Sequence, residues 1–168
     1  MKERHRTKQK YRGEKLLSET DANMKLLRRS SKLLDAIVKS LDDFDLETRK
    51  RIMESCGKAC AQEDGDLAIA EEIGKTAGNM TEVVERINKE LLWCGIWSQK
   101  GRSIESTCTK CGCPLVKNKA INRNATWCYC SRGWVKAIFE AALKKPVEVE
   151  LEKSIGRGDS VCRFVVHT

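Results

Sequence analysis

The sequence predicts an α+β fold in which an N-terminal helical half packs on a small antiparallel sheet that carries a cysteine-rich segment. Two patterns lead to this prediction. Apolar residues recur at three-four spacing through the first half, and two strictly alternating runs flank a glycine-containing turn near the end. With 168 residues, of which 33% are charged, the chain has the composition of a globular protein.

Residues 1–22 are polar and lack apolar periodicity, so we expect a basic, flexible N-terminal arm. Residues 1–15 carry seven Lys or Arg against two Glu, which accounts for five of the eight net positive charges. A basic tail of this kind is usually a solvated arm, and no aromatic-rich basic motif accompanies it. A nucleic-acid partner is therefore disfavoured.

Residues 23–97 are predicted to form the helical half, with four helices. The first covers 24–41, where apolar residues follow an amphipathic pattern. Three more helices follow, separated by capping residues and glycines. The residues that predict these starts and stops are Asp45, Gly65, Asn79, Glu82 and Gly95.

Residues 98–168 are predicted to form a cysteine-rich α+β half, which we expect to fold as one cooperative unit with the helices. Glycine, asparagine and cysteine imply loops and short strands over about 100–130. Ser131 can cap a helix that runs through Leu143. The alternating runs 147–151 and 161–166 then predict an antiparallel hairpin.

Several classes of protein are disfavoured by what the sequence lacks. No apolar run approaches the roughly 20 residues of a membrane span, and no apolar segment follows the basic start as in a secretory signal. We therefore expect a cytoplasmic protein with no membrane partner. Its two histidines, His5 and His167, belong to no catalytic pattern, so catalytic residues stay unknown.

Nine cysteines in a cytosolic chain are expected to stay reduced, so metal binding or redox chemistry is the leading explanation. Cys108 and Cys111 form a knuckle followed by Gly112, and Cys128 and Cys130 come after an interval that suits a four-cysteine zinc site. Their last pair is one residue short of the usual spacing. The candidate metal ligands are Cys108, Cys111, Cys113, Cys128, Cys130 and Cys162.

Alternatives remain open within this set. On an extended strand, Cys128 and Cys130 would point to opposite faces, so that Cys113 or Cys162 could replace one of them. Cys162 can equally be a buried small hydrophobe. Zinc is favoured by the knuckle, and an iron–sulfur cluster is the alternative.

A second cysteine pair, Cys56 and Cys60, lies four residues apart on one face of the second predicted helix. This spacing could hold a metal or another cofactor. It can equally belong to the core, because it continues the apolar stripe of Ile52.

The end of the chain resembles a known superfamily. The motifs are Cys128-Tyr-Cys130-Ser-Arg-Gly133-Trp134 and Gly158-Asp159-Ser-Val-Cys162-Arg-Phe164. Over roughly residues 126–168 they resemble the 4-vinyl reductase type small-molecule-binding domain, including the L-2-amino-thiazoline-4-carboxylic acid hydrolase family. The resemblance implies an α+β fold around a ligand pocket, with Cys130 and Cys162 as zinc ligands. Ser154 stands where the zinc-binding members have a cysteine.

Together these patterns predict a cytosolic cysteine-metal protein that binds or senses a small molecule, with a structural zinc ion and a pocket between the helices and the hairpin. A hydrolase acting on a small C–N or thiazoline-type substrate is one alternative, and an iron–sulfur protein is another. The expected partner is a small-molecule ligand, and a homo-oligomer is left open.

Overall fold

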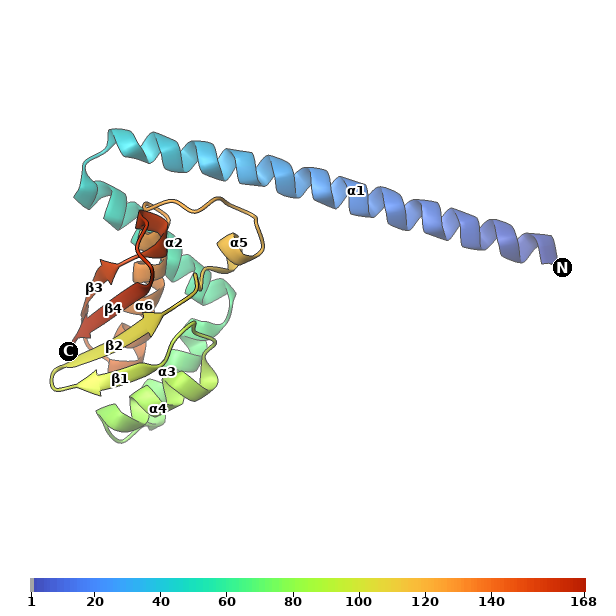
Figure 1. Ribbon diagram of the computed structural model, residues 1–168. Coiled ribbons are helices and arrows are strands. Elements are labelled where there is room, and N and C mark those ends of the chain that lie inside the picture. The colour runs from blue at the N-terminus through green and yellow to red at the C-terminus, as the bar shows by residue number, and fades with distance from the viewer. Residues whose placement is uncertain (1) are drawn as a thin grey trace.

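The computed structural model describes the backbone of residues 2–168 and the side chains of residues 21–168. It has an α+β fold, as predicted (Figure 1). The elements in chain order are α1 (Lys2–Ser40), η1 (Leu41–Asp43), α2 (Leu46–Glu63), α3 (Asp66–Thr76), α4 (Met80–Glu90), β1 (Trp97–Lys100), β2 (Ser103–Cys108), α5 (Pro114–Lys117), α6 (Cys128–Leu143), β3 (Glu148–Lys153), η2 (Ile155–Arg157) and β4 (Cys162–His167).

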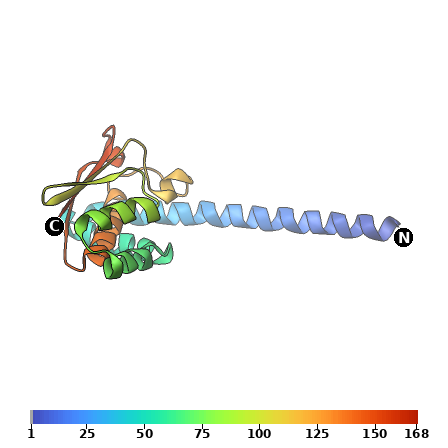
Figure 2. The ribbon, with the colours of Figure 1, turned by 90° about the horizontal axis from the view of Figure 1, so that it is seen from below.

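The sheet has four antiparallel strands in the order β1-β2-β4-β3. The predicted hairpin is confirmed, because β3 and β4 pair with Val149 opposite Val166. Strand β2 adds to the other edge of β4, with Ile104 opposite Val166. Alternate β2 residues, including Ile104 and Cys108, are buried. Helices α4 and α6 contact the sheet, while α2 and α3 pack on α6 (Figure 2).

Helices α2 and α6 approach each other most closely at two glycines. A Cβ atom added to Gly57 would lie 2.0 Å from the Cys130 carbonyl oxygen, and one added to Gly133 would lie 2.3 Å from the Glu54 carbonyl oxygen. Any larger side chain would force the two backbones apart. The crossing also brings Arg132 of α6 into an ion pair with Glu54 of α2.

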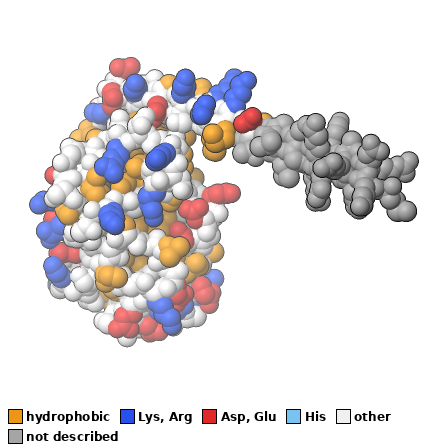
Figure 3. Space-filling view, turned by 45° about the vertical axis from the view of Figure 1, so that its right-hand side comes forward, with side chains coloured by type: hydrophobic (Ala, Val, Ile, Leu, Met, Phe, Trp, Pro, Cys, Tyr) orange, Lys and Arg blue, Asp and Glu red, His pale blue; other side chains and the backbone are white. Residues whose placement is uncertain are grey.

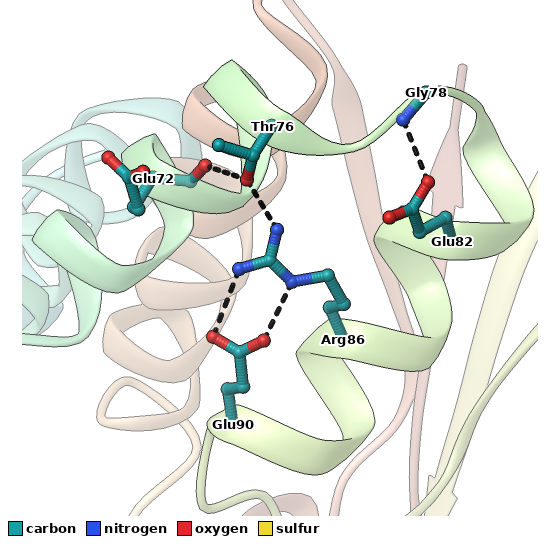
Figure 4. A network of polar contacts seen from close by, with 6 residues as sticks. All are labelled: Glu72, Thr76, Gly78, Glu82, Arg86 and Glu90. Carbon is teal, nitrogen blue, oxygen red and sulfur yellow. Dashed lines mark hydrogen bonds and ion pairs between the residues drawn. The ribbon is translucent and has the colours of Figure 1, made fainter.

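Local capping signals fix the helix starts where the sequence predicts them. Asp45 Oδ1 accepts the Thr48 backbone N–H at 2.9 Å, and Asn79 Oδ1 accepts that of Glu82 at 3.0 Å. The Glu82 carboxylate reaches back to the Gly78 backbone N–H at 2.8 Å, one residue earlier than in an ideal capping box (Figure 4). These bonds satisfy backbone donors that the first helical turn leaves open.

A polar network joins α3 to α4. Arg86 donates to the Glu90 carboxylate at 2.7 Å and also to the Thr76 hydroxyl, which in turn donates to the Glu72 carbonyl (Figure 4). The helix pair is thereby held by side chains on its exposed side, while Val83 and Ile87 are buried in the core.

Helix α1 extends away from the body of the molecule (Figures 1 and 2). Val38 and Leu41 are buried against the body, whereas Leu26 and Leu33 are exposed by 62% and 57%. The side chains of residues 1–20 lie outside the described range. The flexibility of the predicted basic arm, residues 1–22, therefore stays a prediction. Within the described residues, no helix combines the length and the apolar character needed to cross a membrane.

Three predicted boundaries are wrong. Helix α1 begins at Lys2, whereas the first helix was expected to begin at residue 24. Helix α6 begins at Cys128 rather than after Ser131, because Asn124 Oδ1 accepts the Thr126 backbone N–H at 2.7 Å and starts the turn earlier. Helix α4 ends at Glu90, and Leu92, which the helical pattern places in the core, is 98% exposed. The expectation of loops and short strands over about 100–130 is confirmed, because this segment contains the six-residue strand β2.

Candidate functional site

A cavity of ≈ 410 Å³ opens where the end of α2, the start of α3, the loop after α4, the loop before α5 and one face of α6 meet. We call it the tryptophan cavity. Its apolar lining comes from Leu92, Trp93, Pro114, Leu115 and Trp134. On α6, Cys130 and Trp134 both face it because they are one helical turn apart.

The aromatic wall is a stacked pair. The rings of Trp93 and Trp134 have centroids 5.0 Å apart and planes 8° from parallel. Each indole N–H has a partner: Trp134 donates to Asp66 Oδ2 at 3.2 Å, and Trp93 donates to the Ser106 hydroxyl at 3.1 Å. The wall is therefore held in place by helices α3 and α6 and by strand β2.

Three thiols line the same cavity: Cys60 from α2, Cys113 from the loop before α5, and Cys130 from α6. Burial raises the pKa of all three, and the neighbouring Cys60 further raises the pKa of Cys130. Thiols with raised pKa values are protonated at neutral pH, which makes them poor nucleophiles.

Three carboxylates, Glu63, Asp64 and Asp66, lie on the side of the cavity where α2 ends and α3 begins. Burial raises the pKa of Asp66, and its hydrogen bond from Trp134 partly opposes this shift. Lys, Arg and His are absent from the described residues that line the cavity. Its polar side is therefore acidic, although several Lys and Arg side chains lie on the face of the body shown in Figure 3 and the whole chain carries a net charge of +8.

A second, much smaller cavity of ≈ 30 Å³ lies near the hairpin turn, and we call it the cysteine cavity. Cys111, Cys128, Cys162 and Ser154 all line it. The Ser154 hydroxyl donates to Cys128 Sγ at 2.8 Å, and the Ile155 backbone N–H donates to Cys162 Sγ at 3.4 Å. A volume of this size suits a water molecule rather than an organic ligand.

The two cysteines of the Cys128-Tyr-Cys130 motif therefore face different cavities. They lie on a helix rather than on the extended strand considered from the sequence, and two residues along a helix turn the side chain by about 200°. Cys128 shares its cavity with Cys162 and Ser154, whereas Cys130 faces Cys60. The resemblance implies Cys130 as the partner of Cys162, but the structure brings Cys128 to that place.

Cys108 is not a free thiol. It forms a disulfide with Cys94, with Cα atoms 5.3 Å apart, which corrects both its assignment as a metal ligand and the expectation that every thiol is reduced. The disulfide joins the loop before β1 to the last residue of β2, segments that formation of the β1–β2 hairpin brings together. Gly112 packs on this bridge, since an added Cβ would lie 2.6 Å from Cys94 Sγ.

Whether these residues can hold a metal ion depends on how the side chains that could act as ligands are grouped. Among residues 21–168, no three or more His, Cys, Asp or Glu side chains are grouped so that they could hold a metal ion. The predicted six-cysteine set is divided between the disulfide, the cysteine cavity and the tryptophan cavity, and Cys56 is exposed on α2. The residues as arranged do not fit zinc or an iron–sulfur cluster. Ligation by the remaining cysteines stays a prediction.

The sequence patterns did not single out Trp93, Leu115 or Asp66 as site residues. Trp134 belongs to the motif that carries the family resemblance. Its position four residues, or one helical turn, after Cys130 is the feature of the sequence that could have placed it beside Cys130. Asp66 carried no signal, because it is one acidic residue within the run 63–66.

Two solved structures show partial likeness to this chain. One is a "trafficking protein particle complex subunit 3 from Naegleria fowleri covalently bound to palmitic acid", with a TM-score of 0.47, 16% identity, and coverage of 84% of this chain and 92% of that one. The other is the "phenol-responsive sensory domain of the transcription activator PoxR with Phenol", with a TM-score of 0.49, 12% identity, and coverage of 82% and 73%. With TM-scores below 0.5, neither likeness assigns a function to this chain.

Comparison with curated proteins gives no match. The resemblance to the 4-vinyl reductase type domain is not confirmed by these comparisons and stays a prediction. A family model does match nearly the whole chain, over residues 7–167. The chain therefore belongs to the "Family of unknown function (DUF6144)".

Proposed function

We propose that this protein binds a small organic molecule in the tryptophan cavity. The main observation that supports this proposal is the cavity itself, which has a volume of ≈ 410 Å³. Ligand sites usually have volumes of about 300–1,000 Å³, apolar and aromatic walls, and a few polar groups at fixed places. The stacked Trp93 and Trp134 and the acidic side around Asp66 fit that description.

The exposure of Leu92 supports the proposal. This side chain lines the cavity and is 98% exposed, which is costly for a large apolar residue. A bound apolar molecule would cover part of its surface. The cavity therefore offers apolar surface to a ligand without any rearrangement of the core.

Binding or sensing is better supported than catalysis. The thiols that line the cavity have raised pKa values, so they are protonated at neutral pH and are poor nucleophiles. Hydrolase activity rests on the family resemblance alone. A zinc ion and an iron–sulfur cluster rest on the cysteine spacing, and elemental analysis of the purified protein tests both. Binding of an organic molecule in the tryptophan cavity requires no metal.

Calorimetric titration with 2-naphthalenemethanol, a neutral aromatic probe, tests the proposal. We expect a dissociation constant on the order of 1 mM or below, given the size of the probe. Leu115→Trp fills the cavity from its wall and should abolish binding, while Ile96→Trp, at an exposed position that does not line the cavity, should leave it unchanged. Thermal unfolding verifies that both variants are folded. Equal binding by both variants would refute the assigned site.

A further inference from the structure

The tryptophan cavity has a charge opposite to that of the whole molecule. Glu63, Asp64 and Asp66 line one side of it, and the described lining contains no cationic side chain. At an ionic strength of about 0.15 M, charges more than roughly 8 Å apart are largely screened. A ligand in the cavity therefore experiences these carboxylates much more strongly than the distant basic residues.

Asp66 is the carboxylate best placed to meet a ligand. It is half-buried, and Trp134 donates to its Oδ2 atom at 3.2 Å, which fixes the orientation of the carboxylate. Its Oδ1 atom accepts no side-chain hydrogen bond from the described residues. A donor group on a ligand could therefore bind Oδ1 without displacing the indole.

The aromatic wall contributes apolar contact rather than attraction for a cation. The group of Trp134 nearest Asp66 is its indole N–H, which donates to Oδ2 from the positively polarised edge of the ring. One face of Trp134 is stacked on Trp93. A preference for a cationic ligand therefore comes from the carboxylates, above all from the free Oδ1 position of Asp66.

An anionic ligand would meet the opposite situation. Its carboxylate or phosphate would lose water and lie beside three acidic side chains without a cationic partner, which is costly. A neutral ligand would gain the apolar contacts and at most an uncharged hydrogen bond to Asp66, without the attraction between opposite charges. The expected order of affinity is cation, then neutral molecule, then anion.

We propose that the tryptophan cavity selects a small aromatic or aliphatic amine in its protonated form, with the ammonium group at Asp66 Oδ1 and the apolar part against Leu92 and Leu115. This inference rests on the proposed function of the cavity and names its ligand class.

Three probes with one naphthalene frame test the inference: 2-naphthylmethylamine, which is cationic at pH 7, 2-naphthalenemethanol, which is neutral, and 2-naphthoate, which is anionic. Calorimetry in 0.15 M NaCl should show the amine binding about tenfold more tightly than the alcohol, and the naphthoate binding most weakly. Glu63→Gln and Asp66→Asn, each nearly isosteric, should lower the ratio of amine affinity to alcohol affinity.

The matched control is Glu148→Gln, an exposed carboxylate on β3 that does not line the cavity. It should keep the full preference for the amine. If the alcohol binds as tightly as the amine, or if the preference survives both cavity substitutions, the ligand class is wrong and the proposed function stands. If no probe binds, the proposed function fails as well.

Discussion

The indole rings of Trp93 and Trp134 lie nearly parallel, with centroids 5.0 Å apart, although 41 positions separate them in the chain. Trp93 follows α4, and Trp134 belongs to α6. Their stack joins the loop after α4 to the helix that packs on the sheet. The side of the tryptophan cavity is thus built from two segments that only the tertiary fold brings together.

The Trp134–Asp66 hydrogen bond should be detectable as an energetic coupling. Trp134→Phe and Asp66→Ala each remove one partner of a bond measured at 3.2 Å. In a double-mutant cycle we expect a coupling free energy of about 0.5–1.5 kcal/mol, the usual net value of one hydrogen bond. Urea unfolding at pH 7 measures it. The control cycle pairs Trp134→Phe with Glu63→Ala and should be additive, and additivity in both cycles would contradict the bond.

Packing at the α2–α6 crossing predicts a large effect of a single methyl group. Gly57→Ala places a Cβ atom 2.0 Å from the Cys130 carbonyl oxygen, so the helices must separate. We expect the free energy of unfolding to fall by about 1–3 kcal/mol. Gly78→Ala is the matched control, because its nearest contact would be an ordinary 3.5 Å to the Glu82 side chain. An equal effect of the two substitutions in thermal unfolding would show that the crossing is looser than described.

The Cys94–Cys108 disulfide predicts a thiol count. Nine cysteines are present, and the seven outside the bridge are free, so the denatured, unreduced protein should react with seven equivalents of a thiol reagent. Closing a loop across a sequence separation of 14 should contribute about 3 kcal/mol to stability. Reduction should therefore raise the count to nine and lower the melting temperature. A count of nine before reduction would mean that the bridge does not form.

Burial of Asp66 predicts a pH dependence of stability. Its pKa in the folded protein is raised above the ordinary value of 3.8, so the folded state binds its proton more tightly than the unfolded state does. Its contribution to stability is therefore complete below pH 3.8 and is lost as the pH rises through the folded pKa. Asp66→Asn keeps an acceptor for Trp134 and cannot ionise. Urea unfolding across this pH range should show the unchanged protein losing stability relative to the variant, and parallel profiles would contradict the shift.

Local signals in the sequence predicted much of the fold. Asp45 and Asn79 cap their helices through bonds made within three residues, so their effect is visible in the sequence. The β3–β4 hairpin was also predictable, because its alternation requires only that one strand face be buried. The pairing of β2 with β4 was not, since it joins Ser103–Cys108 to a strand more than fifty positions away.

The site was harder to predict because cysteine spacing does not specify a partner. The Cys108-Thr-Lys-Cys111 pattern suits a metal knuckle, yet Cys108 meets Cys94 once β1 and β2 pair. The start of α6 three residues before Ser131 also decides which cavity Cys128 and Cys130 face. A helix start predicted three residues too late leaves Cys128 and Cys130 outside the helix, so the sequence pattern does not indicate which cavity each side chain faces.

The tryptophan cavity can be tested most directly through the indole N–H signals of the four tryptophans in a ¹H–¹⁵N NMR spectrum. Trp134 lines only the tryptophan cavity of the two, Trp93 lines both cavities, and Trp127 lines only the cysteine cavity. During titration with 2-naphthylmethylamine we expect the Trp93 and Trp134 signals to shift together in a saturable manner, while the Trp127 signal stays in place. Saturable shifts confined to Trp127, or a spectrum without shifts at millimolar probe, would contradict a ligand site in this cavity.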